Sequence, residues 1–282
     1  MNKIQEPKKI IISANKKRQL FNLKELIYYK DLLYFFVLRD ITVLYKQTIL
    51  GFFWAILNPL FQMVVFSIIF GKLADISSDG IPYPIFSFVA ILPFNYFSQS
   101  LNGASASLVG SAGVFTKIYF PRILIPLTPV LSKLADFFIA FIILIGMMIF
   151  YNISPNANIV FLPLLIVLMI LSSMGLGMWL SSLAIQYRDV KFAIGFVTTF
   201  LLYAAPVVFP ASLVLEKFGY DLYLMYGLYP MAGVIEGFRS SLLGFRPMPW
   251  DLIGMGSLSA VILFISGALY FNRSERIFAD VA

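Results

Sequence analysis

The sequence of 282 residues contains no cysteine and no histidine. Without cysteine there is no disulfide framework, so cysteine usage gives no information about the redox compartment. A Cys/His metal site is excluded as well, and no imidazole can act as a general base. The sequence also lacks a GxxxxGK[ST] phosphate loop and a GxSxG nucleophile elbow. Enzymatic chemistry would have to use the 14 Asp and Glu residues, few of which lie in apolar surroundings.

Charge is scarce as well. Charged residues make up 12% of the chain and hydrophobic residues 60%, and the mean hydropathy is +0.87. An ordinary soluble domain is about a quarter charged. A soluble protein with a large core is the alternative, but a chain of this length must still present a mostly polar surface to water. The composition therefore predicts an integral membrane protein.

Long apolar stretches recur along the chain, and six of them reach the length of about 20 residues that crosses a bilayer. Backbone groups in lipid must be paired within their own segment, so the stretches are predicted to be helices. The sequence thus predicts an all-α membrane protein with six transmembrane helices. The predicted spans are 52–70, 85–108, 124–150, 159–185, 192–209 and 252–271.

Basic residues are distributed unevenly between the connections of these spans. Residues 1–50 contain ten of the 21 Lys and Arg. Together with the second-to-third connection, the fourth-to-fifth connection and the tail, one side of the membrane has 17 basic residues, and the other side has four. Because basic residues stay on the cytoplasmic side, both termini are expected in the cytosol. The N-terminus does not resemble a cleaved signal. A nucleic-acid surface is the alternative source of the +7 net charge, but these residues are distributed by side of the membrane.

The segment before the first span has the pattern of a helix lying on the membrane surface. On a 3.6-residue period four apolar residues share one face, with Lys24 and Asp31 opposite. The four are Leu26, Tyr29, Leu33 and Phe36. An amphipathic interface helix near 23–38 is therefore predicted, with a plain linker as the alternative. The predicted division is a cytosolic segment 1–50, a membrane domain 51–272 and a cytosolic tail 273–282.

The connection between the fifth and sixth spans is long and apolar, in contrast to a free loop. Several Gly residues and Pro230 interrupt it, so a pair of short re-entrant helices is predicted, with a seventh span as the alternative. Within it Glu236 and Arg239 are three residues apart and can pair on one helix face.

The connection between the second and third spans combines basic and aromatic residues with several prolines. Its basic residues mark it as cytosolic, while its apolar side chains would be exposed there, which suggests docking to a partner. Anchoring at the membrane interface is the alternative. The residues concerned are Val114, Phe115, Lys117, Tyr119, Phe120 and Arg122.

Two charges and two groups of small residues lie within the predicted spans. Lys133 and Asp136 can neutralise each other at a spacing of three residues. Charges inside a span are costly, so this pair is either functional or a structural pair near the inner interface. Small residues gather in "NGASASLVGSAG" and around Gly175 and Gly177, where they allow close helix packing, with a flexible gating helix as the alternative.

Taken together, several stretches resemble one family. "RDITVLYKQTILGFFWAILNPLF", "VFTKIYFPRILIPL", "LAIQYRDVKFAI", "LYPMAGVIEGFRSSLLG" and the tail "NRSERIFADVA" are similar to the permease subunits of polysaccharide and O-antigen ABC exporters, a family of ABC-2 type transporters. The resemblance covers about residues 22–282. The family also includes exporters of teichoic acid and capsule.

The resemblance implies a homodimer in the bacterial inner membrane that moves a lipid-linked glycan from cytosol to periplasm. It implies that this chain is a transport subunit without enzymatic activity or cofactors, and that ATP and Mg²⁺ bind two separate ATPase subunits. Contacts to the ATPases are expected at Val114, Phe115, Lys117, Tyr119, Phe120, Arg122, Tyr187, Arg188 and Asp189. Cationic candidates for the diphosphate head group are Arg39, Lys46 and Lys117. The expected outer gate comprises Tyr229, Pro230, Glu236 and Arg239.

Two other classes, and one rival within the favoured class, stay open at this point. A secondary transporter would use intramembrane ionisable residues, for which only Lys133 and Asp136 are candidates. A membrane enzyme would need paired carboxylates. The only candidates for such a pair are the acidic residues expected on the outer side, Asp75, Asp79, Glu216 and Asp221. A small-molecule exporter of the same transporter class is the third alternative.

Overall fold

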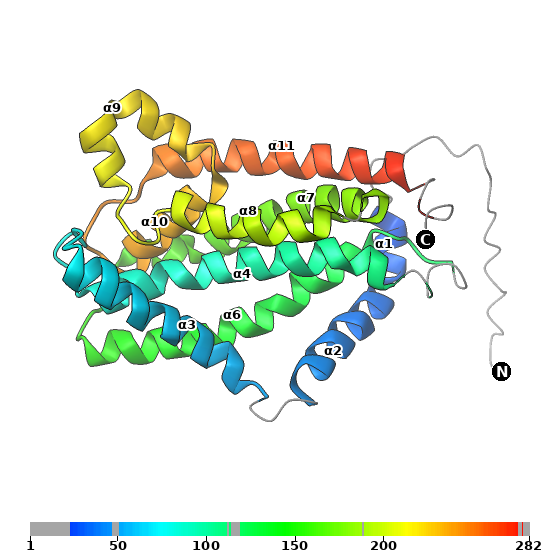
Figure 1. The fold of residues 1–282 in the computed structure, drawn as a ribbon, viewed down its shortest axis with the longest axis horizontal. Helices are drawn as coiled ribbons and strands as arrows, with labels where there is room; N and C mark the ends of the chain where they lie inside the picture. Colours follow the sequence, from blue (N-terminus) through cyan, green and yellow to red (C-terminus); the bar gives the residue numbers. More distant parts are fainter. Residues whose placement is uncertain are drawn as a thin grey trace, which may run out of the picture.

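The computed structural model describes residues 23–46, 51–111, 113, 119–187, 189–275 and 278. Within these residues the regular structure is entirely helical, as predicted, and no strand occurs. The long helices lie side by side along the longest dimension of the molecule (Figure 1).

The helices follow the apolar stretches of the sequence. Their bounds are α1 Leu23–Tyr28, α2 Lys30–Lys46, α3 Phe53–Phe66, the π-helix η1 Ser67–Leu73, α4 Tyr83–Gly110, α6 Leu124–Phe150, the 3₁₀ helix η2 Ala157–Phe161, α7 Leu162–Gln186, α8 Val190–Ala204, α9 Ser212–Gly227, α10 Pro230–Leu243 and α11 Trp250–Ser274.

Four segments in the described part are long and apolar enough to cross a membrane. They are Phe53–Leu73, Leu124–Phe150, Ala157–Gln186 and Trp250–Ser274. They correspond to the predicted first, third, fourth and sixth spans. The second, α4, has 28 residues and contains a row of polar side chains, and the fifth, α8, has only 15.

The predicted end of the fifth span was wrong. The apolar sequence continues to Phe209, but α8 ends at Ala204 and Ala205 is extended. Pro206 explains the difference, because proline disfavours helical backbone at the residue before it. Residues 205–211 instead form a turn that leads into α9.

The two ends of the bundle differ in the elements that they contain. One, here called the terminal end, contains α1, the last turn of α4, the first turn of α6 and the last turn of α11; the opposite end contains η1, α9 and α10 (Figure 1). At the terminal end Leu124 of α6, Phe271 of α11 and Phe278 form one buried cluster. The helices next to the two chain ends therefore meet on one side of the molecule.

The predicted apolar face of the N-terminal segment forms and packs against protein. Leu26, Tyr29, Leu33 and Phe36 all contact the terminal-end cluster. The ring of Phe36 lies 5.6 Å from that of Phe120. The helix is also longer than predicted, since α2 continues to Lys46.

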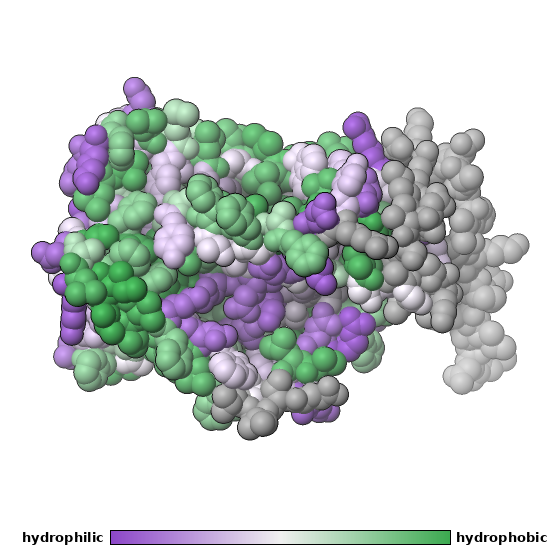
Figure 2. All heavy atoms as spheres, in the orientation of Figure 1, coloured by the Kyte–Doolittle hydropathy of each residue, from purple (hydrophilic) through white to green (hydrophobic). Residues whose placement is uncertain are grey.

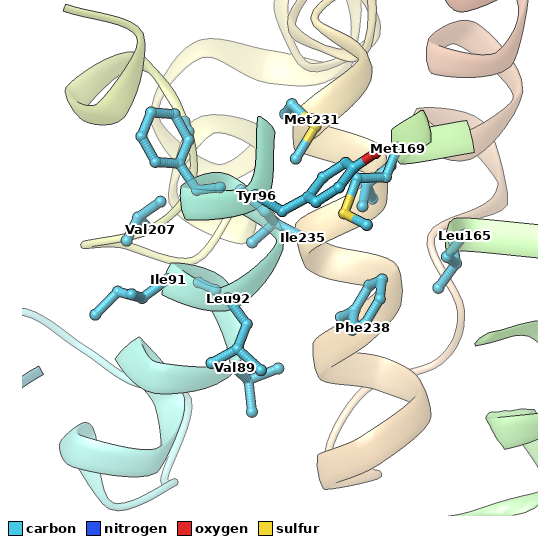
Figure 3. Packing of buried hydrophobic residues seen from close by; sticks show 14 of the residues in the cluster. Val89, Ile91, Leu92, Tyr96, Leu165, Met169, Val207, Met231, Ile235 and Phe238 are labelled. Carbon is cyan, nitrogen blue, oxygen red and sulfur yellow. The ribbon is translucent and has the colours of Figure 1, made fainter. Parts of the chain in front are cut away.

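The main core joins α4, α6, α7 and α10. Figure 3 shows its centre, where side chains from three of these helices interdigitate. The labelled residues are Val89, Ile91, Leu92 and Tyr96 of α4, Leu165 and Met169 of α7, Met231, Ile235 and Phe238 of α10, and Val207 of the turn after α8. Nearly every residue of α10 is buried, so this short helix is an interior element of the bundle.

Glycine permits the closest helix contact. A Cβ atom on Gly267 of α11 would lie 2.3 Å from the carbonyl oxygen of Gly175 of α7, and one on Gly175 would lie 2.6 Å from the backbone of Phe264. These distances are too short for any side chain, so α7 and α11 touch backbone to backbone. Small residues in the fourth span thus have the packing role predicted for them.

Candidate functional site

Hydrophilic residues gather in the middle of one face of the molecule, between α2 and α3 and in front of α4 and α6 (Figure 2). Apolar surface surrounds this region toward the opposite end. Two cavities open here, and they share part of their lining.

The first cavity lies nearer the terminal end, between α2, the last turns of α4 and the first half of α6. Its volume is about 440 Å³. Arg39 and Asp40 of α2 line it and form an ion pair of 2.8 Å. Small residues of α4, including Gly103 and Ser107, form its wall.

The second cavity, called here the deeper cavity, lies between α3, α4, α6 and the end of α2. Its volume is about 560 Å³. The residues that line it are Val43, Leu44, Tyr45, Gly51, Trp54, Ala55, Asn58, Pro59, Leu92, Asn95, Tyr96, Gln99, Lys133, Asp136, Phe137 and Ala140. Amide, aromatic and charged side chains thus meet inside an otherwise apolar bundle.

Three polar residues stand where the two cavities meet. Tyr45, Lys133 and Asp136 line both of them. The predicted pair of Lys133 and Asp136 forms at 2.8 Å, and the Tyr45 hydroxyl donates a hydrogen bond to the other carboxylate oxygen of Asp136. Burial and the neighbouring carboxylate raise the pKa of the Tyr45 hydroxyl, so it remains a donor. The group ties the end of α2 to α6.

At the opposite end a second polar group holds the turn after α8. Arg239 of α10 is buried, and its guanidinium lies 2.7 Å from Glu236 and 3.6 Å from the centre of the Phe86 ring. It also donates to the carbonyl oxygen of Val207 at 2.9 Å and to those of Phe86 and Phe209 at 3.4 Å. Glu236 in turn accepts the backbone N–H of Ala211 at 2.9 Å.

The same turn has further side-chain partners, because a buried non-helical backbone needs its polar groups paired. The Tyr83 hydroxyl donates to the carbonyl of Val208, and the Tyr226 hydroxyl donates to that of Ala204, both at 2.7 Å. The expected gate residues Tyr229 and Pro230 stand at the start of α10, where Pro230 occupies its first turn. The buried Tyr229 hydroxyl has no hydrogen-bond partner among the described residues.

The residues expected to contact an ATPase have different environments. The Tyr119 side chain is 62% exposed and Tyr187 is 61% exposed, and Asp189 is exposed as well. Val114, Phe115, Lys117 and Arg188 lie outside the described residues.

The expected exposure of Phe120 was wrong. Its side chain is 4% exposed, because it fills the terminal-end cluster below Phe36. Arg122 donates to the backbone carbonyl of Glu275 at 2.6 Å and lies 3.9 Å from its carboxylate. Burial raises the pKa of the Glu275 carboxyl, and Arg122 opposes this effect. Arg122 thus joins the start of α6 to the end of α11.

The three candidate residues for a head-group site also lie in different environments. Arg39 lines the first cavity and Lys46 is exposed at the end of α2, while Lys117 lies outside the described residues. Among the described residues no group of acidic side chains is arranged to hold a metal ion.

Several residues of the site were not predicted from the sequence. The sequence does not connect Tyr45 or Trp54 with Lys133, because these residues are far apart in the chain and come together only in the lining of the deeper cavity. Asn95 and Gln99 were also missed, although two amides one helical turn apart in an apolar run are a recognisable signal. A further unpredicted pair joins Arg246 to Asp79 at 2.8 Å across the opposite end.

These features define a class of protein. Several long apolar helices surround a hydrophilic hollow with charged groups inside it, which is the arrangement of a multi-pass membrane permease. The model of the family described as "ABC-2 type transporter" matches residues 32–243, and the chain belongs to this family.

Individual relatives support the narrower resemblance seen in the sequence. The chain is 26% identical over 255 residues to the O-antigen export system permease protein RfbA of Myxococcus xanthus. The aligned region covers 90% of this chain and 96% of that protein. It is 24% identical over 255 residues to RfbA of Klebsiella pneumoniae, with the same coverage. It is 24% identical over 244 residues to the polysialic acid transport protein KpsM of Escherichia coli, covering 84% of this chain and 92% of that protein. The resemblance to permeases of polysaccharide ABC exporters is thereby confirmed.

Proposed function

We propose that this chain is the channel-forming permease subunit of an ATP-driven exporter that moves a lipid-linked polysaccharide from the cytosol to the periplasm of a bacterium. The observation that carries the proposal is the pair of cavities that meet at Tyr45, Lys133 and Asp136 and so place charged and polar side chains inside an apolar bundle. The family and the printed functions of the relatives supply the class of substrate.

In this proposal the chain crosses the inner membrane six times, with the terminal end in the cytosol. The polar row on α4 is then a consequence of function, because that helix faces the path and not lipid. The short α8 completes its crossing with the buried turn 205–211. Both termini lie in the cytosol, in agreement with the distribution of basic residues.

The functional unit is a homodimer. In one chain the hollow is open on the face seen in Figure 2, and lipid cannot hydrate its polar residues. A second copy would close it into a channel. The helix α8, which packs against α4, carries three exposed aromatic residues on one stripe, Phe192, Phe196 and Phe200, and these suit such an interface.

Two ATPase subunits dock at the terminal end and supply the energy. Tyr119 and Tyr187 are exposed there, next to the stretches 114–118 and 188. This chain then has no catalytic site of its own, and ATP and Mg²⁺ are bound by the partners. Because Phe120 contacts α2 and Arg122 joins α6 to α11, a push on this surface reaches three helices, of which α2 and α6 line the first cavity.

The substrate would enter with its diphosphate near the exposed side chains of Arg39 and Lys46 on α2, and it would leave past α9 and α10. Arg239 and Glu236 would control the exit, since they hold the turn 205–211 against α4 and α10. Tyr229 and Pro230 stand beside this turn at the start of α10.

The test is export in cells. In a bacterial host that lacks its own polysaccharide-export permease, this chain together with its ATPase should restore glycan on the cell surface. Glycan that stays inside the cell despite correct membrane insertion of both proteins would refute the function.

Coupling is tested separately with Tyr119→Ala. The variant should lower the ATP hydrolysis of the reconstituted complex, whereas Tyr220→Ala, an exposed tyrosine at the opposite end, should leave it unchanged. Equal hydrolysis in both variants would remove Tyr119 from the docking surface.

Two alternatives have specific support. The KpsM relatives transport polysialic acid by name, so a capsule-like or other polymer is the first alternative. The intramembrane pair of Lys133 and Asp136 is the feature that an ion-coupled transporter would use. Export that continues after ATP depletion and stops when the ion gradient collapses would favour that second alternative.

A further inference from the structure

The deeper cavity contains amide groups that the protein itself leaves without partners. Asn58 of α3 and Gln99 of α4 line it, and neither side chain has a hydrogen-bond or ion-pair partner in the described part of the chain. Asn95 donates one N–H to Gln62 at 2.8 Å. Asn58 is exposed and Gln99 partly exposed at this cavity, so their amide groups can both donate to and accept from a molecule outside the chain.

Lys133 can also donate hydrogen bonds into the deeper cavity. Its ammonium has three N–H groups, of which Asp136 accepts one at 2.8 Å. Asp136 is in turn occupied by Lys133 on one oxygen and by the Tyr45 hydroxyl on the other. The remaining lysine donors are therefore available to a ligand, while the carboxylate is largely satisfied.

An aromatic face completes the lining. The Trp54 side chain is 48% exposed and borders the deeper cavity one helical turn before Asn58. An indole combines a large apolar face with one N–H donor. The cavity thus presents an aromatic plane next to groups that both donate and accept hydrogen bonds.

We propose that the deeper cavity is a carbohydrate subsite, in which Trp54 stacks against a sugar ring while Asn58, Gln99 and Lys133 bind its hydroxyl groups. The inference rests on the proposed function and adds to it the residues that contact the glycan. A volume of about 560 Å³ is typical of a small-molecule site and accommodates a short glycan segment.

Charge balance favours sugar over the diphosphate at this position. Lys133 is the one cation among the described residues that line the deeper cavity, and Asp136 already neutralises it. A diphosphate would bring several negative charges into a site with no net positive charge, which is strongly unfavourable inside a membrane protein. Neutral hydroxyl groups carry no such penalty. A lipid chain would leave the amides unpaired.

The inference can be tested by binding with the full chain in lipid nanodiscs. The variant Trp179→Phe/Trp250→Phe leaves Trp54 as the single tryptophan of the three in the sequence. One probe is the oligosaccharide released by mild acid hydrolysis from the lipid-linked glycan of cells that contain this chain. The other is farnesyl diphosphate, which has the diphosphate and a lipid tail without sugar. We expect the oligosaccharide to change the Trp54 emission saturably and farnesyl diphosphate to leave it unchanged.

Substitutions in the lining identify the site. Asn58→Leu/Gln99→Leu keeps the approximate side-chain volume and removes the amides, so oligosaccharide affinity should fall by about tenfold or more, which corresponds to about 1.4 kcal/mol. Gln99→Leu alone should give a smaller loss and serves if the double variant does not assemble. The matched control is Asn102→Leu, an amide on the same helix that lies outside both cavities and donates to the Ser98 carbonyl. It should bind like the parent. Calorimetry on chains with all three tryptophans provides the second measurement.

The outcomes separate this inference from the proposed function. Oligosaccharide binding that is absent, or equal in the Gln99→Leu and Asn102→Leu variants, overturns the subsite even where the cells export glycan normally. Binding of farnesyl diphosphate alone also overturns it and assigns the cavity to the head group. Failure of the parent chain to support export would instead refute the function itself.

Discussion

Arg239 and Glu236 form a buried ion pair of 2.7 Å on α10, with side chains that are 5% and 12% exposed. The pair also binds backbone outside α10, since Arg239 donates to Val207 and Glu236 accepts from Ala211. A short interior helix is thereby fixed to the buried turn after α8. The pair acts as a structural anchor for this turn, and any gating motion at this end has to rearrange it.

The first prediction concerns the loss of one partner of this pair. Arg239→Met should reduce the stability of the protein strongly, by about 3–5 kcal/mol, because Glu236 is left as an unpaired buried charge. Three carbonyl groups also lose their donor. The measurement is the melting temperature of the purified chain in detergent.

Two further variants separate charge from hydrogen bonding. Arg239→Lys keeps the positive charge without the planar group of five donors, so its stability should lie between those of the parent and Arg239→Met. Arg239→Met/Glu236→Met removes both charges and should recover part of the loss. A melting temperature for Arg239→Met close to that of the parent would show that the pair does not hold the turn.

The second prediction compares two tyrosines near this turn. The Tyr226 hydroxyl donates to the Ala204 carbonyl at 2.7 Å, whereas the Tyr229 hydroxyl is buried without a partner among the described residues. Tyr226→Phe should therefore cost about 1 kcal/mol, because it removes the hydrogen bond to a partly buried carbonyl. Tyr229→Phe should be neutral or stabilising. Thermal melting of the two variants measures the difference, and a larger loss for Tyr229→Phe would contradict the assignment.

The pattern of hydrophobic residues predicted most of the helices, but not their neighbours. The period placed Leu26 and Phe36 on one face of the N-terminal segment, and both pack against the same buried cluster. Periodicity indicates a face without saying what covers it. The membrane surface was expected there, and the structure places the terminal-end cluster against it. The same burial explains why Phe120 was wrongly expected to be exposed.

The backbone of the fifth span shows a second limit. Hydropathy depends only on composition, so the apolar run predicted a helix to Phe209. The effect of Pro206 on the residue before it ends α8 at Ala204. Local pairs at a spacing of three, such as Lys133 with Asp136, could be predicted because helix geometry alone brings them together. The bond between Tyr45 and Asp136 joins residues 91 positions apart, and no local rule indicates it.

That bond is the basis of the third prediction. Tyr45→Phe removes the hydrogen bond that ties the end of α2 to α6, so α2 should open more often and its amides should exchange faster with deuterium. Exchange of peptides that cover 30–46 is the measurement. Tyr34→Phe is the matched control, because Tyr34 is on the same helix and its side chain is 60% exposed. Equal exchange in the two variants would mean that the Tyr45 hydroxyl does not restrain α2.

The fourth prediction concerns the contact between α7 and α11. A methyl group on Gly267 would lie 2.3 Å from the Gly175 carbonyl oxygen, which is backbone and cannot move aside without the helix. Gly267→Ala should therefore separate the two helices, lower the melting temperature and reduce export. Gly254→Ala is the matched control on the same helix, because a Cβ there meets no atom within 4 Å. Since alanine favours helix over glycine by about 1 kcal/mol, the control should be neutral or slightly stabilising. Equal melting temperatures and export for Gly267→Ala and Gly254→Ala would contradict the backbone contact, because helix propensity would then be the only effect of either substitution.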